Sequence, residues 1–150
     1  MRYEDLLIEN EYIDVIETSS LPYFQSGLYY DGTIYIREDM SDYKKHETLA
    51  EEIAHHKITY GDILDQSNML NKKFEIKARR LANESVITLQ GLINAFNYGV
   101  QNIFELALYF EVTKAFVLDT IQHYKQKYGL SVSYGGYIIK FEPLTIYKNI

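Results

Sequence analysis

Alternation of apolar and polar side chains marks the first third of the chain as rich in strands. The pattern predicts a short helix over residues 3–12, a strand over Tyr12–Ile16 and a β-hairpin over Gly27–Ile36. The hairpin is centred on Asp31-Gly32, a pair that favours the positive φ angles of a two-residue turn. We therefore expect a small antiparallel sheet in this part of the chain.

Beyond the hairpin, apolar residues recur at the three-to-four-residue spacing of helices. Ser41 or Asp42 can cap a helix that runs to about Lys57, and a loop of roughly ten residues then precedes the next helix. Further helices are expected over Asn71–Glu84, Leu89–Tyr98, Ile103–Phe110 and Thr113–Tyr128, and a second hairpin over Val132–Phe141. The pattern predicts an α+β fold in a single domain, residues 1–150, whose C-terminal part is a helical bundle with a terminal β-hairpin.

Composition and charge narrow the class of protein. The chain has 150 residues, of which 47% are hydrophobic and 24% charged, as in ordinary globular domains. Its net charge of −6 disfavours a generic nucleic-acid binder, because phosphate contacts require a basic surface. The sequence has no cysteine, no apolar run of membrane-spanning length and no signal-peptide core. We expect a cytoplasmic protein without disulfides.

The candidate chemistry lies in the predicted helix that contains His46–His56. On a helical wheel, Glu51 and His55 lie one turn apart, and their side chains can hold one metal ion together. Zinc peptidase helices use H-E-x-x-H, in which two histidines bind the metal and the glutamate acts on water. In this frame Glu52 fills the general-base position, His55 the second ligand position, and Glu51 the first.

A second pattern follows on the next predicted helix, in the segment 75–82. Glu75, Ala78 and Ala82 share one helix face there. Small side chains at two of these positions allow the helix to lie close against its neighbour. We therefore expect Glu75 to approach the candidate site.

Together the two patterns resemble the ImmA/IrrE family of zinc metallo-endopeptidases. Members carry a helix like L-A-H/E-E-L-G-H-H, followed by E-x-x-A-x-x-x-A on the next helix. Residues 60–67 also look like the connecting loop of phage-encoded members. The resemblance covers most of the chain and includes residues 124–129 and 136–139. It implies a zincin-like helix pair against which the small sheet packs.

The resemblance also implies roles for individual residues. Zinc would be bound by Glu51, His55 and Glu75, and Glu52 would be the general base. The implied substrate is a protein, a helix-turn-helix repressor, whose cleavage would release lysogenic or stress genes of a phage or mobile element. No direct contact with nucleic acid is expected.

Glu51 stands where many members of the family have a histidine, and this departure keeps a second function open. A non-catalytic regulator on the same scaffold could bind a repressor without cutting it. Arg79 or Arg80 could also pair with Glu51 or Glu52, which would make the site an ion-pair network without a metal.

Other polar side chains near the motif have structural interpretations beside functional ones. His46 falls on the apolar arc of the helix, so it is expected to be a core histidine. His56 could support the site indirectly or pair with Glu52. Asp62 and Asp65 could offer oxygen to a metal, although such loop residues mostly stabilise turns.

Residues 104–118, within a helix-turn-helix-like part at about 88–128, permit a third function, DNA binding. That function would require basic and base-reading side chains on the second helix of the motif. The second helix has Lys114 near its start, Lys125 and Lys127 at its end, and no arginine. A structural bundle, or a docking surface for a protein partner, is the better interpretation.

Overall fold

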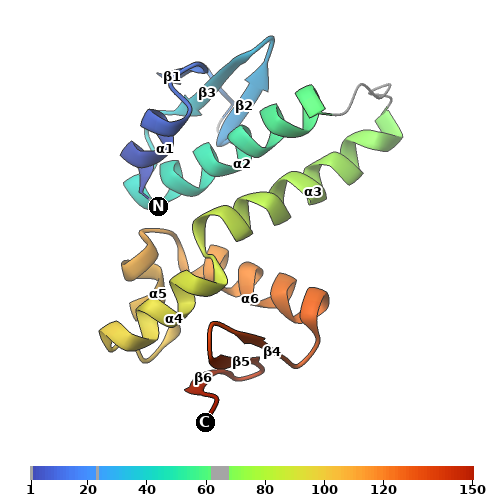
Figure 1. Ribbon diagram of the computed structural model, residues 1–150. Helices are drawn as coiled ribbons and strands as arrows, with labels where there is room; N and C mark the ends of the chain where they lie inside the picture. Colours follow the sequence, from blue (N-terminus) through green and yellow to red (C-terminus); the bar gives the residue numbers. More distant parts are fainter. Residues whose placement is uncertain (1, 23, 62–67) are drawn as a thin grey trace. The chain divides into compact units, whose positions relative to one another are not determined.

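The computed structural model describes residues 2–22, 24–61 and 68–150, and the chain divides into two compact units, Met1–Val86 and Ile87–Ile150 (Figure 1). Each unit combines helices with a three-stranded sheet, so the predicted α+β fold is confirmed. The expectation that residues 1–150 form a single domain stays a prediction. Among the described helices, none is both long and apolar enough to cross a membrane.

The first unit consists of a small sheet, a short helix and two long helices. Figure 1 shows α2 running along the sheet and α3 lying beside α2, and contacts join α2 to α1, β2, β3 and α3. In chain order the elements are α1 (Tyr3–Glu9), β1 (Asp14–Thr18), β2 (Gly27–Tyr30), β3 (Thr33–Arg37), α2 (Asp42–Gly61) and α3 (Asn68–Val86).

The sheet of this unit has the order β1-β3-β2 and is mixed, so the prediction of an antiparallel sheet is wrong for one strand pair. The β2–β3 hairpin is antiparallel as predicted, with Asp31 at φ 50° and Gly32 at φ 80° in its turn. β1, however, pairs parallel with β3. Ile34 and Ile36 of β3 are fully buried, which favours the central position for that strand. The chain therefore passes from β1 to the far edge and returns between the two strands.

Several predicted boundaries move by a few residues. The first helix ends at Glu9, three residues earlier than predicted. At the next residue, Asn10, the side-chain amide donates to the Leu6 carbonyl at 2.9 Å. The following strand accordingly begins at Asp14. Most of the loop predicted between the two long helices falls at residues 62–67, outside the described residues.

The close packing of α2 and α3 follows from the small residues predicted to permit it. Ala54, Ile58 and Ala78 form a buried cluster, and Phe74 packs against it. Ala82, one turn beyond Ala78, is also fully buried. Side chains this small allow the two helices to approach closely, which brings polar residues on the adjoining faces within reach of each other.

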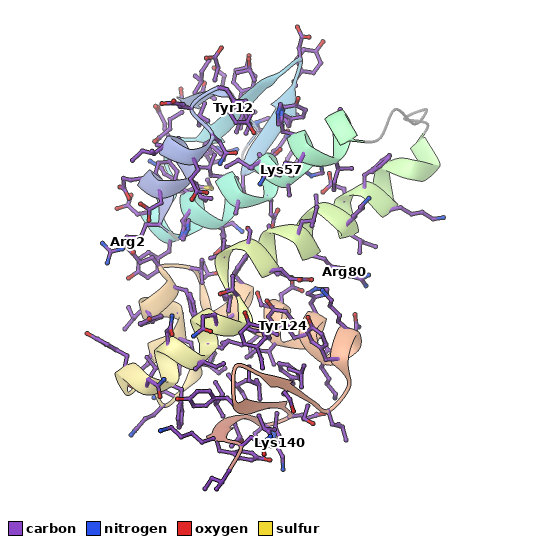
Figure 2. All side chains as sticks on the ribbon, viewed as in Figure 1. Arg2, Tyr12, Lys57, Arg80, Tyr124 and Lys140 are labelled. Carbon is purple, nitrogen blue, oxygen red and sulfur yellow. The ribbon has the colours of Figure 1, made fainter. Side chains whose placement is uncertain are left out.

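The second unit consists of three short helices and a sheet of order β4-β5-β6. Tyr124, labelled in Figure 2, lies in its core, stacks on Phe141 at 5.9 Å and donates a hydrogen bond to the Ile87 carbonyl at 2.6 Å. The predicted terminal hairpin is present, and a third strand, β6, extends it. The elements are α4 (Leu89–Tyr98), α5 (Ile103–Phe110), α6 (Lys114–Tyr128), β4 (Ser131–Tyr134), β5 (Tyr137–Phe141) and β6 (Leu144–Lys148).

Candidate functional site

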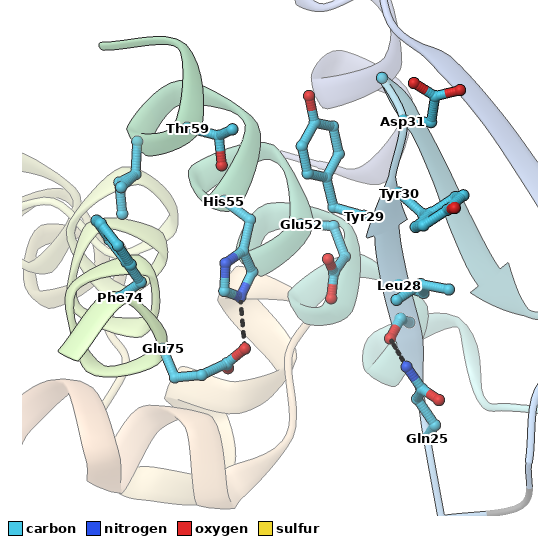
Figure 3. Close-up of a pocket in the computed structure, with 13 residues that line it drawn as sticks. Gln25, Leu28, Tyr29, Tyr30, Asp31, Glu52, His55, Thr59, Phe74 and Glu75 are labelled. Carbon is cyan, nitrogen blue, oxygen red and sulfur yellow. Dashed lines mark hydrogen bonds and ion pairs between the residues drawn. The ribbon is translucent and has the colours of Figure 1, made fainter. Parts of the chain in front are cut away.

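A pocket of about 620 Å³ opens in the first unit between β2, α2 and α3 (Figure 3). All four residues of β2 line one wall, and Glu52 and His55 of α2 line another. Glu75 and Phe74 of α3 complete it. Three of the four predicted site residues thus line a single pocket, because α2 and α3 present them toward the same edge strand.

His55 and Glu75 meet directly across the two helices. The Nε2 atom of His55 lies 3.2 Å from Oε1 of Glu75, as the dashed line in Figure 3 marks. The His55 side chain is 18% exposed and the Glu75 side chain 62%, so the pair lies at the mouth of the pocket. The prediction that the second helix brings Glu75 toward His55 agrees with this geometry.

Glu52 also lines the pocket and is more buried than Glu75. Burial, and then the negative charges of Glu51 and Glu75, raise the pKa of the Glu52 carboxyl to about 8. The backbone N–H of Tyr29 donates to the same carboxylate and acts in the opposite direction. Because this pKa lies above neutrality, the carboxyl holds a proton at pH 7 when no cation is near it.

Glu51 lies one helical turn before His55 on α2 and is not among the residues that line the pocket. Its Oε1 atom lies 4.0 Å from Nε of Arg79, which is the ion-pair partner considered from the sequence. Burial raises the pKa of Glu51, while the positive charges of Arg79 and Lys44 oppose that rise. In this arrangement Glu51 faces a cation on α3 and is not grouped with His55 and Glu75.

The spacing of His55 and Glu75 can be judged against the bond lengths of a zinc site. Zinc bonds imidazole nitrogen and carboxylate oxygen at about 2.0–2.2 Å in a tetrahedron, which separates two donor atoms by about 3.3 Å. The 3.2 Å between His55 and Glu75 therefore suits two ligands of one ion. Within the described part of the chain, no group of three or more His, Cys, Asp or Glu side chains is arranged to hold a metal. The residues fit zinc at two positions, and the third predicted ligand, Glu51, lies 4.0 Å from Arg79.

The other polar residues singled out in the sequence have different outcomes. His46 is buried, with 1% of its surface exposed, as expected for a core position. His56 contacts Tyr29: its Nδ1 atom lies 2.8 Å from the Tyr29 hydroxyl. Burial, and then the nearby charge of Lys57, lower the pKa of His56. Asp62 and Asp65 lie outside the described residues.

Tyr29 is the residue of this site that the sequence did not reveal. It lines the pocket, donates its backbone N–H to Glu52 and contacts His56 through its hydroxyl. Nothing in the β2 sequence separates it from Tyr30, its neighbour in the strand. Only the register of β2 against α2 distinguishes them.

The helix-turn-helix-like segment forms α5 and α6, joined by a tight turn in which Glu111 adopts φ 58°. Lys114 at the start of α6 lies over the ring of Phe104, 4.3 Å from its centroid. The positive side chain nearest the start of the second helix is thus engaged with an aromatic ring of the first.

Comparisons with known proteins agree with the fold and the helix pair. A search of curated proteins finds no match. Among solved structures, a Mycobacterium tuberculosis transcriptional regulator is similar in fold, with a TM-score of 0.59 and 14% sequence identity. The match covers 79% of this chain and 38% of that one, so this chain spans well under half of the regulator's length.

The model of the Peptidase_M78 family, described as the IrrE N-terminal-like domain, matches residues 8–122. That segment contains β1 to β3, α2 and α3, and it therefore includes the whole pocket with Glu52, His55 and Glu75. The match confirms the ImmA/IrrE resemblance at the level of the family. On this evidence the chain belongs to the IrrE N-terminal-like domain family of metallopeptidases.

Proposed function

We propose that this chain is a metal-dependent endopeptidase that cuts a protein partner. The proposal rests on the 3.2 Å approach of His55 and Glu75 at the mouth of a pocket that also contains Glu52. An imidazole, a carboxylate and a second, more buried carboxylate are the side chains that metal-assisted peptide hydrolysis requires. The pocket is large enough to admit a peptide segment beside these groups.

In this proposal His55, Glu75 and Glu51 would hold the metal, and the imidazole donor favours zinc over magnesium or calcium. When bound, zinc supplies a Lewis acid that makes water a stronger acid and polarises the peptide carbonyl. Glu51 lies one helical turn before His55, so the two side chains can face one ion. Its pairing with Arg79 at 4.0 Å competes with that role.

Glu52 acts as the general base. Its carboxylate accepts a proton from water at Oε and later passes that proton to the leaving amine. In the metal-free chain, burial and two neighbouring carboxylates keep the Glu52 carboxyl protonated. A cation held by His55 and Glu75 would favour the ionised form, since an opposite charge nearby lowers the pKa of a carboxyl.

For the substrate we propose a helix-turn-helix repressor, with the chain acting as a phage-encoded or mobile-element regulator of lysogeny in the cytoplasm. This part of the proposal rests on the motif resemblance. The unit that contains the pocket supports it by charge, because Met1–Val86 has ten Lys and Arg against seventeen Asp and Glu. An acidic surface attracts basic partners such as DNA-binding domains and repels DNA itself.

The decisive experiment compares wild type with Glu52→Gln in the cleavage of purified helix-turn-helix repressors, in the presence of zinc. Loss of a general base typically reduces the rate about a hundredfold or more. We expect Glu52→Gln to bind zinc and to lose cleavage. Glu11→Gln, an exposed carboxylate away from the pocket, is the matched control and should cleave normally. Cleavage by Glu52→Gln at the wild-type rate would exclude Glu52 as the base.

A second candidate function is a non-catalytic regulator that binds the repressor without cutting it. The observation that favours it is the Glu51–Arg79 pair, which occupies the side chain that stands in place of the usual histidine. In the same experiment this function predicts equal repressor binding by wild type and Glu52→Gln, with no cleavage by either.

A further inference from the structure

The edge strand β2 lies close against α2 because of one glycine. A Cβ atom added at Gly27 would lie 2.6 Å from Cγ2 of Thr48 and 3.2 Å from Cγ of Glu52, so only glycine permits this approach. Side chains two residues apart in a strand point to the same face. Tyr29 therefore points toward α2, as Gly27 does, while Tyr30 points away from it.

The backbone N–H of Tyr29 points outward from the open edge of the sheet. Arg37 donates its N–H to the Ser26 carbonyl at 2.9 Å, which makes that pair hydrogen-bonded. Because hydrogen-bonded pairs alternate along antiparallel strands, Leu28 and Tyr30 also bond to β3, whereas the N–H of Tyr29 faces away from it. The Glu52 carboxylate accepts this N–H.

The side chain of Tyr29 reaches α2 at a second point. Its hydroxyl lies 2.8 Å from Nδ1 of His56, and the two rings meet edge to face at a centroid distance of 5.3 Å. The ring of Tyr12 also approaches His56, with 5.8 Å between the ring centroids and a tilt of 56° between the ring planes. His56 is one helical turn after Glu52, so both contacts come from the same face of α2.

We propose that Tyr29 and His56 are positioning residues that fix the Glu52 carboxylate in the pocket. One strand residue is held at two points by one helix: its N–H by Glu52 and its hydroxyl by His56. Holding the phenol fixes the backbone of Tyr29, and the fixed N–H then limits the orientations open to the Glu52 side chain. The catalytic consequence rests on the proposed function, whereas the two-point contact does not.

The test measures hydrogen exchange of the Tyr29 amide in the full chain. Tyr29→Phe and His56→Ala each remove one half of the side-chain contact, and His56→Asn retains an acceptor at the position of Nδ1. We expect exchange of the Tyr29 amide to become about tenfold faster in the first two variants, since one hydrogen bond is weakened, and to stay near wild type in His56→Asn. Tyr98→Phe, an exposed tyrosine of the second unit, is the matched control.

Unchanged exchange at Tyr29 in both Tyr29→Phe and His56→Ala would overturn the proposal. Equally faster exchange of the Leu28 amide, which bonds to β3, would also overturn it. The substitutions would then have disrupted the whole β2 strand and not the Tyr29 contact alone. In a cleavage assay the proposal predicts a lower kcat with unchanged KM for His56→Ala, and recovery in His56→Asn. If the wild type cuts nothing, the proposed function fails, and the exchange measurement still decides the positioning role.

Discussion

The two units of the chain reach their folds by different means. In the second unit, Thr88, Asn102 and Thr113 each begin a helix by accepting a backbone N–H three residues on. The same helices end at or just before residues with positive φ, Gly99, Glu111 and Gly129. In the first unit the decisive contacts join distant parts of the chain, such as the parallel β1–β3 pair and the His55–Glu75 contact. Local signals thus specify the second unit, and long-range packing specifies the first.

The units also differ in charge and in the chemistry of their pockets. The first unit has a net charge of −7, and its pocket is lined by carboxylates, an imidazole and two tyrosines. The second has five Lys and no Arg against four Asp and Glu, a net charge of +1, and a pocket in it is lined mainly by aliphatic side chains. The difference indicates that the candidate catalytic chemistry belongs to the first unit.

The largest effect is expected for zinc affinity at Glu51. If Glu51 is a ligand, Glu51→Ala should weaken zinc binding about tenfold or more, while Glu51→His should hold or raise affinity because imidazole suits zinc well. Arg79→Ala removes the competing partner at 4.0 Å and should strengthen binding. Titration calorimetry on the four proteins measures this. Equal affinities in all four would show that Glu51 is not a ligand and would favour the non-catalytic regulator.

The second effect concerns stability without metal. The pKa of Glu52 is raised from its ordinary value of 4.5 to about 8 in the fold. Between pH 4.5 and pH 8 the folded chain therefore keeps a proton on Glu52 that the unfolded chain has lost. Stability should therefore fall as pH rises through that window. Glu52→Gln removes this dependence and should stabilise the metal-free chain at pH 7.5 by about 1–3 kcal/mol.

Urea unfolding at pH 5 and pH 7.5, with Glu11→Gln as the control, checks the sign of this effect. The gain from Glu52→Gln should shrink at pH 5, where the wild-type carboxyl is protonated in the fold and partly so in the unfolded chain. A gain that grows toward acid would contradict the assignment of a raised pKa to Glu52.

The sequence predicted the parts that depend on local signals and on motif spacing. The Asp31-Gly32 turn, the bounds of α4 and α5 and the approach of Glu75 to His55 all follow from residues near each other or from a repeated small-residue face. The parallel pairing of β1 did not follow, because strand order depends on which strand is buried most. The contacts of Glu51 with Arg79 and of His56 with Tyr29 depend on the rotation and register of packed elements, which periodicity leaves undetermined.

The third effect tests whether the second unit is structural. Tyr124 is 2% exposed, and its hydroxyl donates to the Ile87 carbonyl at 2.6 Å. Tyr124→Phe leaves that buried carbonyl without its partner, so the free energy of unfolding should fall by about 1–2 kcal/mol. Zinc affinity should stay at the wild-type value. A change in zinc affinity would show that the second unit also influences the zinc site of the first unit.

The smallest expected effect is on DNA. The second unit carries the helix-turn-helix-like segment, yet it has no arginine, and Lys114, at the start of α6, lies over the Phe104 ring. Binding to duplex DNA depends on several phosphate contacts from Lys and Arg, and each missing contact lowers affinity and salt dependence. At physiological salt we therefore expect no sequence-specific binding in a fluorescence anisotropy titration with operator DNA, and Lys114→Gln should change nothing. Nanomolar binding that Lys114→Gln weakens would contradict this expectation. It would show that the second unit binds DNA and would favour the DNA-binding function.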